Sequence, residues 1–134
     1  MKPVAVPADA ERLAMDYLNI QLPLHASTAT AGISVPVEWD DATTPFVQVA
    51  LDGTPETVYP LMAVATIRLT AWHTTATGAK QLVGLAQGLM LAHGGGGGIQ
   101  SVRFLTGTLP TRDTKTGAEL ASATVAVRVE FATA

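Results

Sequence analysis

Alternation of apolar and polar residues is clearest near the carboxyl-terminal end, in the segment LASATVAVRVEFATA (120–134). Ala, Val and Phe occupy every second position there, and mostly Ser, Thr, Arg and Glu stand between them. A strand that is covered on one face and solvated on the other has this period of two. The pattern therefore predicts a long strand over residues 120–134.

Four further segments are typical of strands, because they are rich in β-branched residues and bounded by turn signals. They cover residues 33–39, 45–51, 61–72 and 99–109. The first contains Pro36, which favours an edge position or a bulge. The second is followed by Asp52-Gly53, which predicts a turn. The third is the longest, and it alternates with Ala65, Ile67, Leu69 and Ala71 on one face and Thr66, Arg68, Thr70 and Trp72 on the other.

Two segments have the period of an α-helix. The first begins after Asp9, which is suited to the N-cap, and Pro23 is expected to end it. The second covers residues 75–93, and its apolar surface is wider than one stripe, which indicates a helix covered on more than one side. Gly84 and Gly88 lie one turn apart in it, and each costs about 1 kcal/mol relative to alanine. Close packing against a sheet or a neighbouring molecule would explain them.

The order of these elements is α-β-β-β-α-β-β. It predicts an α+β fold, in which a mostly antiparallel sheet of about five strands has two helices packed on one face. The last two strands are joined by a polar loop, PTRDTKTGAE (110–119), which is either an exposed hairpin tip or a contact arm. The length of 134 residues is that of one domain, over residues 1–134.

Five consecutive glycines, residues 94–98, connect the second helix to the strand that follows. A dinucleotide-binding loop needs a different glycine spacing and the order strand, loop, helix. A phosphate here would also meet the carboxyl-terminal end of a helix, where the dipole repels anions. We expect Gly94 to be a left-handed C-cap and the others to form a slack, exposed connector. Replacing two of the glycines with alanine is then expected to leave the fold intact.

Composition narrows the classes of function. The chain is 48% hydrophobic and only 14% charged, which indicates either a surface partly covered by a partner or the residue usage of a GC-rich genome. Its net charge of −3, with scattered Lys and Arg, does not favour nucleic-acid binding. There is no cysteine, so disulfides and cysteine metal sites are excluded. The longest apolar run, residues 82–92, is about half of a membrane span and is too short to cross a membrane.

Catalytic and cofactor motifs are not evident. His25, His73 and His93 are too far apart for a local metal-ligand pair, and His93 is placed for ordinary helix capping. The carboxylates of EWDD (38–41) are interpreted as a solvated turn, because alternation separates them. No serine stands in a nucleophile elbow. We therefore expect no enzyme activity, no cofactor and no metal.

The order of elements is similar to that of the tail terminator proteins of long-tailed bacteriophages. The resemblance is carried by the first helix, by PFVQVAL (45–51) and by VATIRLTAWHTTATGAKQLVGLAQGLMLAH (64–93). In that family a strand ending in an aromatic residue leads into a helix rich in Ala and Leu, and a later strand pair closes the sheet. The similarity covers nearly the whole chain and rests on this pattern.

The resemblance implies a structural virion protein at the tail end of the neck, assembled in the host cytoplasm. Such proteins form a ring, expected to be a hexamer, that caps the tail tube, stops tube polymerisation and offers a surface for head–tail joining. The implied partners are other copies of the chain, the major tail tube protein and the head-side connector, with DNA only passing through the lumen and no membrane involved. The candidate interface residues are Leu85, Met90, Leu91, Arg112, Asp113 and Lys115.

Two other interpretations remain open from the sequence. One is a different neck component, such as a head-closure or connector protein, or a minor tail protein. The other is a small enzyme or ligand-binding α+β domain.

Overall fold

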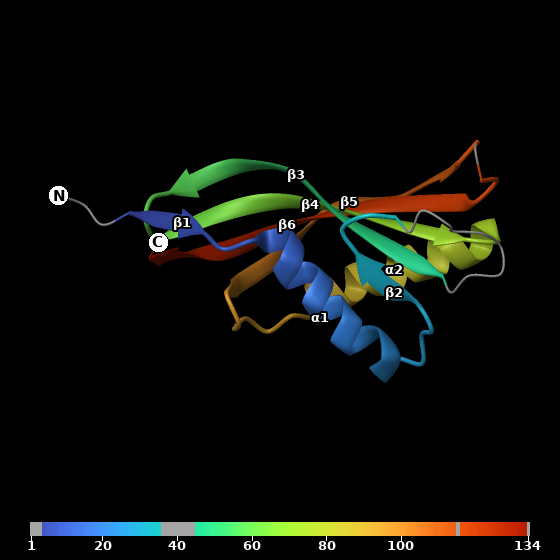
Figure 1. The fold of residues 1–134 in the computed structure, drawn as a ribbon, viewed down its shortest axis with the longest axis horizontal. Helices are drawn as coiled ribbons and strands as arrows, with labels where there is room; N and C mark the ends of the chain where they lie inside the picture. Colours follow the sequence, from blue (N-terminus) through green and yellow to red (C-terminus); the bar gives the residue numbers. More distant parts are fainter. Residues whose placement is uncertain (1–3, 36–44, 115, 134) are drawn as a thin grey trace.

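The computed structural model describes residues 4–35, 45–114 and 116–133. Six strands and two helices follow one another in this part of the chain (Figure 1). Their bounds are β1 Ala5–Pro7, α1 Ala10–Leu24, β2 Thr30–Gly32, β3 Phe46–Val58, β4 Met62–His73, α2 Ala76–Leu91, β5 Ile99–Arg112 and β6 Glu119–Thr133. The α+β class is confirmed, and so are both helices.

The strands form one curled, mixed sheet. Its order is β2-β3-β4-β6, and the far edge of β6 pairs with β5 along most of its length and with β1 at its end. All neighbouring pairs are antiparallel except β2 and β3, which are parallel. The prediction of about five mostly antiparallel strands is therefore only partly correct, because it omitted β1 and β2.

Strand β2 lies between the first predicted helix and residue 33, where no helix or strand was predicted. Thr30–Gly32 is short and has no alternation, but its position is set by α1. The Asn19 side chain donates to the carbonyl of Ala31 at 2.9 Å and accepts from its N–H at 2.8 Å. The expected strand at 33–39 is wrong over residues 33–35, where the chain bends at 33–34 and forms no strand, and its remaining residues lie outside the described part of the chain. The position of this strand is therefore set by hydrogen bonds to a helix and not by the local sequence pattern.

Strand β3 continues well beyond the turn that was predicted at Asp52-Gly53. The pairing with β4 shifts register on each side of Gly53, whose φ is +134°, so this glycine forms a bulge within the strand. The Leu51 N–H donates to Glu11 Oε2 of α1 at 2.6 Å and holds the strand where the bulge begins. The turn predicted at Asp52-Gly53 is therefore a bulge within a long strand.

Both helices cover the same face of the sheet and enclose one core (Figure 1). The predicted inner face of residues 61–72 is confirmed, because Ala65, Ile67, Leu69 and Ala71 are all buried in that core. Helix α1 contributes Leu18 and α2 contributes Val83, neither of which has exposed surface. The predicted N-cap of α1 is confirmed, because Asp9 accepts from the N–H of Arg12. At the start of α2, Thr75 accepts from the N–H of Gly78.

The glycine run is a hydrogen-bonded turn and not a slack connector. Gly95, Gly96, Gly97 and Gly98 have φ of +87°, +111°, +65° and +98°, so the left-handed conformation begins one residue later than predicted. Gly96 and Ile99 exchange two backbone hydrogen bonds, and the Gly98 carbonyl accepts from the N–H of Glu130. Alanine at two of these four positions is expected to strain the turn, since a side chain is unfavourable at positive φ.

Candidate functional site

The candidate residues on α2 differ in their exposure. Met90 has no exposed surface and belongs to the core of its own chain, so its place in the predicted interface is corrected. Leu85 is half-buried beside the same core and lines a shallow hollow between the end of α1 and the start of α2. Leu91 is 38% exposed, and it alone of the three presents a substantial apolar surface outward.

The two helical glycines lie on the outward face of α2. Both Gly84 and Gly88 are exposed, and an added Cβ at either position would meet no atom within 4 Å. The sheet therefore does not explain why this helix lacks side chains there. Close approach of a neighbouring molecule remains the explanation proposed from the sequence.

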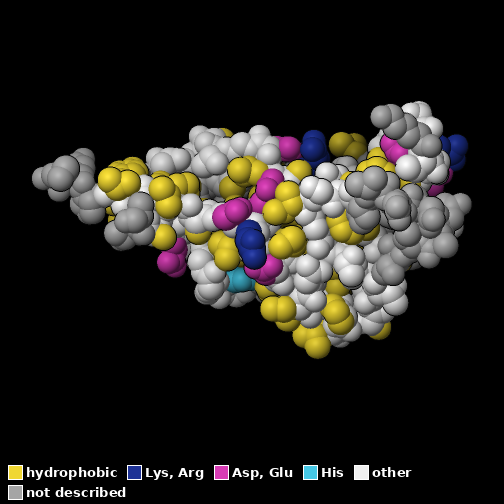
Figure 2. Space-filling view, in the orientation of Figure 1, with side chains coloured by type: hydrophobic (Ala, Val, Ile, Leu, Met, Phe, Trp, Pro, Cys, Tyr) yellow, Lys and Arg dark blue, Asp and Glu magenta, His cyan; other side chains and the backbone are white. Residues whose placement is uncertain are grey.

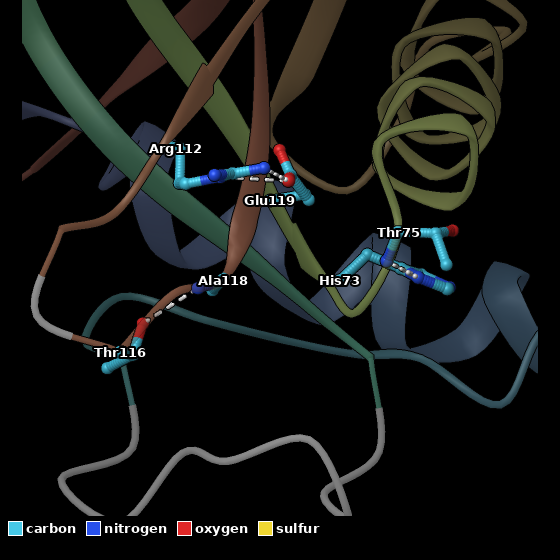
Figure 3. Close-up of polar contacts among 6 residues, drawn as sticks. All are labelled: His73, Thr75, Arg112, Thr116, Ala118 and Glu119. Carbon is cyan, nitrogen blue, oxygen red and sulfur yellow. Dashed lines mark hydrogen bonds and ion pairs between the residues drawn. The ribbon is translucent and has the colours of Figure 1, made fainter.

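The polar loop between the last two strands is shorter than predicted, because β5 extends to Arg112 and β6 begins at Glu119. The Arg112 guanidinium donates to Glu119 Oε1 from Nε at 3.0 Å and from Nη2 at 2.6 Å (Figure 3). The pair closes the base of the turn, and because its guanidinium is largely exposed it stabilises the fold by at most about 1 kcal/mol.

Asp113 and Thr116 organise the turn itself. Asp113 Oδ2 accepts from the N–H of Thr116 at 2.9 Å and from its hydroxyl at 2.6 Å. Thr116 Oγ1 in turn accepts from the N–H of Ala118 at 3.2 Å (Figure 3). Arg112 and Asp113 therefore hold the hairpin tip together, and the third candidate there, Lys115, lies outside the described residues.

Each histidine makes a local hydrogen bond. His73 Nδ1 accepts from the N–H of Thr75 at the start of α2, as Figure 3 shows, and His93 Nδ1 accepts from the N–H of Gly95. The His93 ring also packs on Tyr17, with the ring centroids 4.6 Å apart. Within the described residues no cluster of three or more His, Asp or Glu side chains could hold a metal ion. Residues 38–41, the predicted acidic turn, lie outside that part of the chain.

The sheet has open edges on opposite sides. No described strand pairs with the outer edge of β5. Strand β2 covers β3 only at Phe46–Gln48, so no described strand pairs with residues 49–58 of β3 on that side, where the Leu51 N–H instead donates to Glu11 of α1. Pro55 in β3 and Pro110 in β5 are typical of edge strands, because proline cannot donate to a ladder. An open edge presents backbone N–H and C=O groups that another chain can pair with.

Large apolar side chains are exposed along and near these edges. On β5 they are Phe104, Leu105 and Leu109, and at the turn between β3 and β4 they are Val58, Tyr59 and Leu61. Leu109 is 65% exposed and Leu61 is 69% exposed. Figure 2 shows that charged side chains are few on the face in view and that apolar ones lie exposed between them. Clusters of this kind mark interaction sites more often than scattered single residues do.

The face of the sheet away from the helices carries most of the arginines. Arg68 pairs with Asp52 there at 3.6 Å. Arg103 and Arg128 lie on the same face and line a hollow of about 250 Å³. Neither Arg103 nor Arg128 was among the predicted site residues. A signal was available, because SVRF (101–104) and AVRV (126–129) each place one arginine at an outward strand position.

Comparison with models of known protein families gave no match, and comparison with curated proteins gave none. None of the helices in the described part of the chain is long and apolar enough to cross a membrane.

Proposed function

We propose that the protein is a structural virion protein that caps the tail tube of a long-tailed phage, stops its polymerisation and provides the head-side joining surface. Its partners are further copies of itself in a ring, expected to be a hexamer, together with the tail tube protein and the connector. The proposal rests on the resemblance of the chain to tail terminators and on the arrangement of its sheet edges. In this role it binds no cofactor and performs no catalysis.

The observation that best supports the proposal is the pair of open edges on opposite sides of one sheet. In a closed ring of identical subunits, each subunit contacts one neighbour through one patch and the other neighbour through a second patch. The two patches must therefore differ and be complementary to each other. The open edge of β5 and the open part of β3 are two such patches, and each carries exposed apolar residues. Addition of a strand from a neighbour would satisfy the open backbone groups of both edges.

Deleting the gene from the phage that carries it tests the function directly. We expect tails of uncontrolled length and heads that remain unjoined, as seen by electron microscopy of lysates. Complementation with the intact gene is the control and is expected to restore normal tails. Tails of normal length with unjoined heads would instead point to a connector or head-closure protein, and normal joined virions would rule out both functions.

A variant with Phe104→Glu and Leu109→Glu is expected to lose ring formation. Both side chains are exposed on β5, so the fold should tolerate the charges while an apolar contact between copies would not. Light scattering of the intact chain is expected to give a multiple of the 13.9 kDa subunit mass, and the variant is expected to give the subunit mass alone.

The matched control carries Ile20→Glu and Leu24→Glu on α1, where the side chains are 64% and 71% exposed. This control is expected to assemble like the unmodified chain, and circular dichroism should show both variants folded. Equal assembly of both variants, or an unmodified chain that stays monomeric at every concentration tested, would contradict an edge-mediated ring.

A further inference from the structure

Arg103 and Arg128 differ from the other arginines of the chain. Arg12, Arg68 and Arg112 each form an ion pair, with Asp16, Asp52 and Glu119 respectively. Within the described residues, Arg103 and Arg128 have no ion pair and no hydrogen bond from the side chain. They line one hollow together. We call these two residues the arginine pair and the space that they line the outer hollow.

Strand register places the arginine pair side by side. Arg128 in β6 lies opposite Ser101 in β5, and Arg103 in β5 lies opposite Ala126 in β6. The two arginines are therefore diagonal neighbours on adjacent strands, within reach of each other for long side chains. Two like charges so placed repel each other unless an anion lies between them. Guanidinium groups bind carboxylates and phosphates through paired N–H donors.

The floor of the outer hollow is apolar. Met62, Val64 and Ala126 form a small cluster of their own on this face, separate from the core under the helices, and each is at most 8% exposed. We call these three residues the apolar floor. Val64 and Ala126 lie directly opposite Arg128 and Arg103 in the pairing, so apolar surface and positive charge are one strand spacing apart.

An acidic residue stands on the opposite side of the outer hollow. Glu56 in β3 lies opposite Val64 in β4, which places it two strand spacings, about 10 Å, from Arg128. A carboxylate there repels a second negative charge and accepts hydrogen bonds from N–H groups. The outer hollow thus favours a ligand with one anionic end, an apolar group beside it and N–H donors further along.

We propose that the outer hollow binds the carboxyl-terminal end of a partner polypeptide. The α-carboxylate lies on the arginine pair, the last side chain on the apolar floor, and a preceding backbone N–H faces Glu56. An α-carboxylate and its own side chain share one carbon atom, and this matches the single strand spacing between charge and apolar surface. The side-chain carboxylate of an internal Asp or Glu lies further from the next apolar side chain on the same face of an extended segment.

The site lies on the face of the sheet, whereas the ring contacts proposed above lie at its edges, so it does not depend on ring formation. A polyphosphate or nucleic-acid ligand fits less well for two reasons. The Glu56 carboxylate shares the hollow, and the whole chain has a net charge of −3. Two arginines and Glu56 give the hollow one net positive charge, which balances only one negative charge on a ligand.

Titration of the isotopically labelled full chain with three small probes tests the proposal by NMR. N-acetyl-L-leucine presents an α-carboxylate beside an apolar side chain, N-acetyl-L-leucinamide lacks the charge, and inorganic phosphate lacks the apolar group. We expect N-acetyl-L-leucine to shift the Nε–H signals of Arg103 and Arg128 and the amide signal of Ser101, with a dissociation constant of about 1–10 mM, as suits so small a ligand. The leucinamide is expected to produce no such shifts.

Two variants and one control complete the experiment. Arg103→Gln and Arg128→Gln are each expected to weaken binding of N-acetyl-L-leucine about tenfold, which corresponds to the loss of one charged hydrogen-bonding group. Arg112→Gln, at the other end of β5, is expected to leave it unchanged. Equal or stronger shifts with phosphate would overturn the assignment in favour of a simple oxyanion site, and so would shifts with leucinamide in favour of an apolar one. The absence of shifts with every probe would overturn the site itself.

Discussion

Replacing both Gly96 and Gly98 with alanine is expected to lower the free energy of unfolding by about 2–4 kcal/mol. Both glycines have positive φ, at +111° and +98°, where a Cβ clashes with the neighbouring backbone. At Gly98 the added Cβ would also lie 3.1 Å from Cδ1 of Leu13, so the Leu13 side chain would have to shift by a few tenths of an ångström. Urea denaturation followed by circular dichroism measures the loss.

A second double variant provides the control. Gly88→Ala and Gly94→Ala change the same number of glycines at positions where φ is not positive and where nothing lies within 4 Å of the added Cβ. This control is expected to be as stable as the unmodified chain or more stable, because alanine favours the helix at Gly88. Equal stabilities of the two double variants would show that the loop tolerates side chains and is slack after all.

Replacing Gln87 with leucine is expected to cost about 2–3 kcal/mol. Gln87 is only 8% exposed, and its Nε2 donates to the carbonyls of Thr106 at 2.8 Å and Thr124 at 3.1 Å. These carbonyls belong to β5 and β6 where their pairing shifts register, so the amide joins the helix to an irregular part of the sheet. Leucine fills similar space but leaves both carbonyls without this donor.

Gln81→Leu is the matched control, since Gln81 is exposed on the same helix and makes no hydrogen bond within the described residues. Its effect on unfolding is expected to stay within about 0.5 kcal/mol. Hydrogen exchange adds a local measurement: amides near Thr106 should exchange faster in the Gln87 variant than in the control. A Gln87 variant no less stable than the control would show that the carbonyls find other donors.

The helices and strands that could be predicted are those whose buried residues recur in the sequence with the period of a helix or a strand. Strand β4 and the alternating β6 have one face in the core, and α2 has its broad apolar stripe, so pattern and burial agree. Strand β2 could not be predicted, because Asn19 holds it from another element. Gly53 was misassigned because the same residue signals a turn or a bulge, and only the partner strand decides between them.

The candidate surfaces were harder to predict than the fold. Met90 was assigned to an interface because α2 carries more apolar residues than one stripe needs, but it has no exposed surface and lies in the core of its own chain. Arg112 and Asp113 were assigned by exposure alone, and their hydrogen bonds within the hairpin depend on residues across the turn. That Arg103 and Arg128 are neighbours could not be predicted, because it depends on the register between β5 and β6.

The position of β6 in the sheet has a consequence for synthesis on the ribosome. Residues 119–133 pair with β4 on one edge and with both β5 and β1 on the other, and neither β5 nor β1 pairs with another described strand. The hairpin of β3 and β4 can form as soon as it emerges, but β1, made first, must wait for nearly the whole domain. Until then the nascent chain exposes the edge of β4, and folding is dominated by contacts distant in sequence, which form slowly.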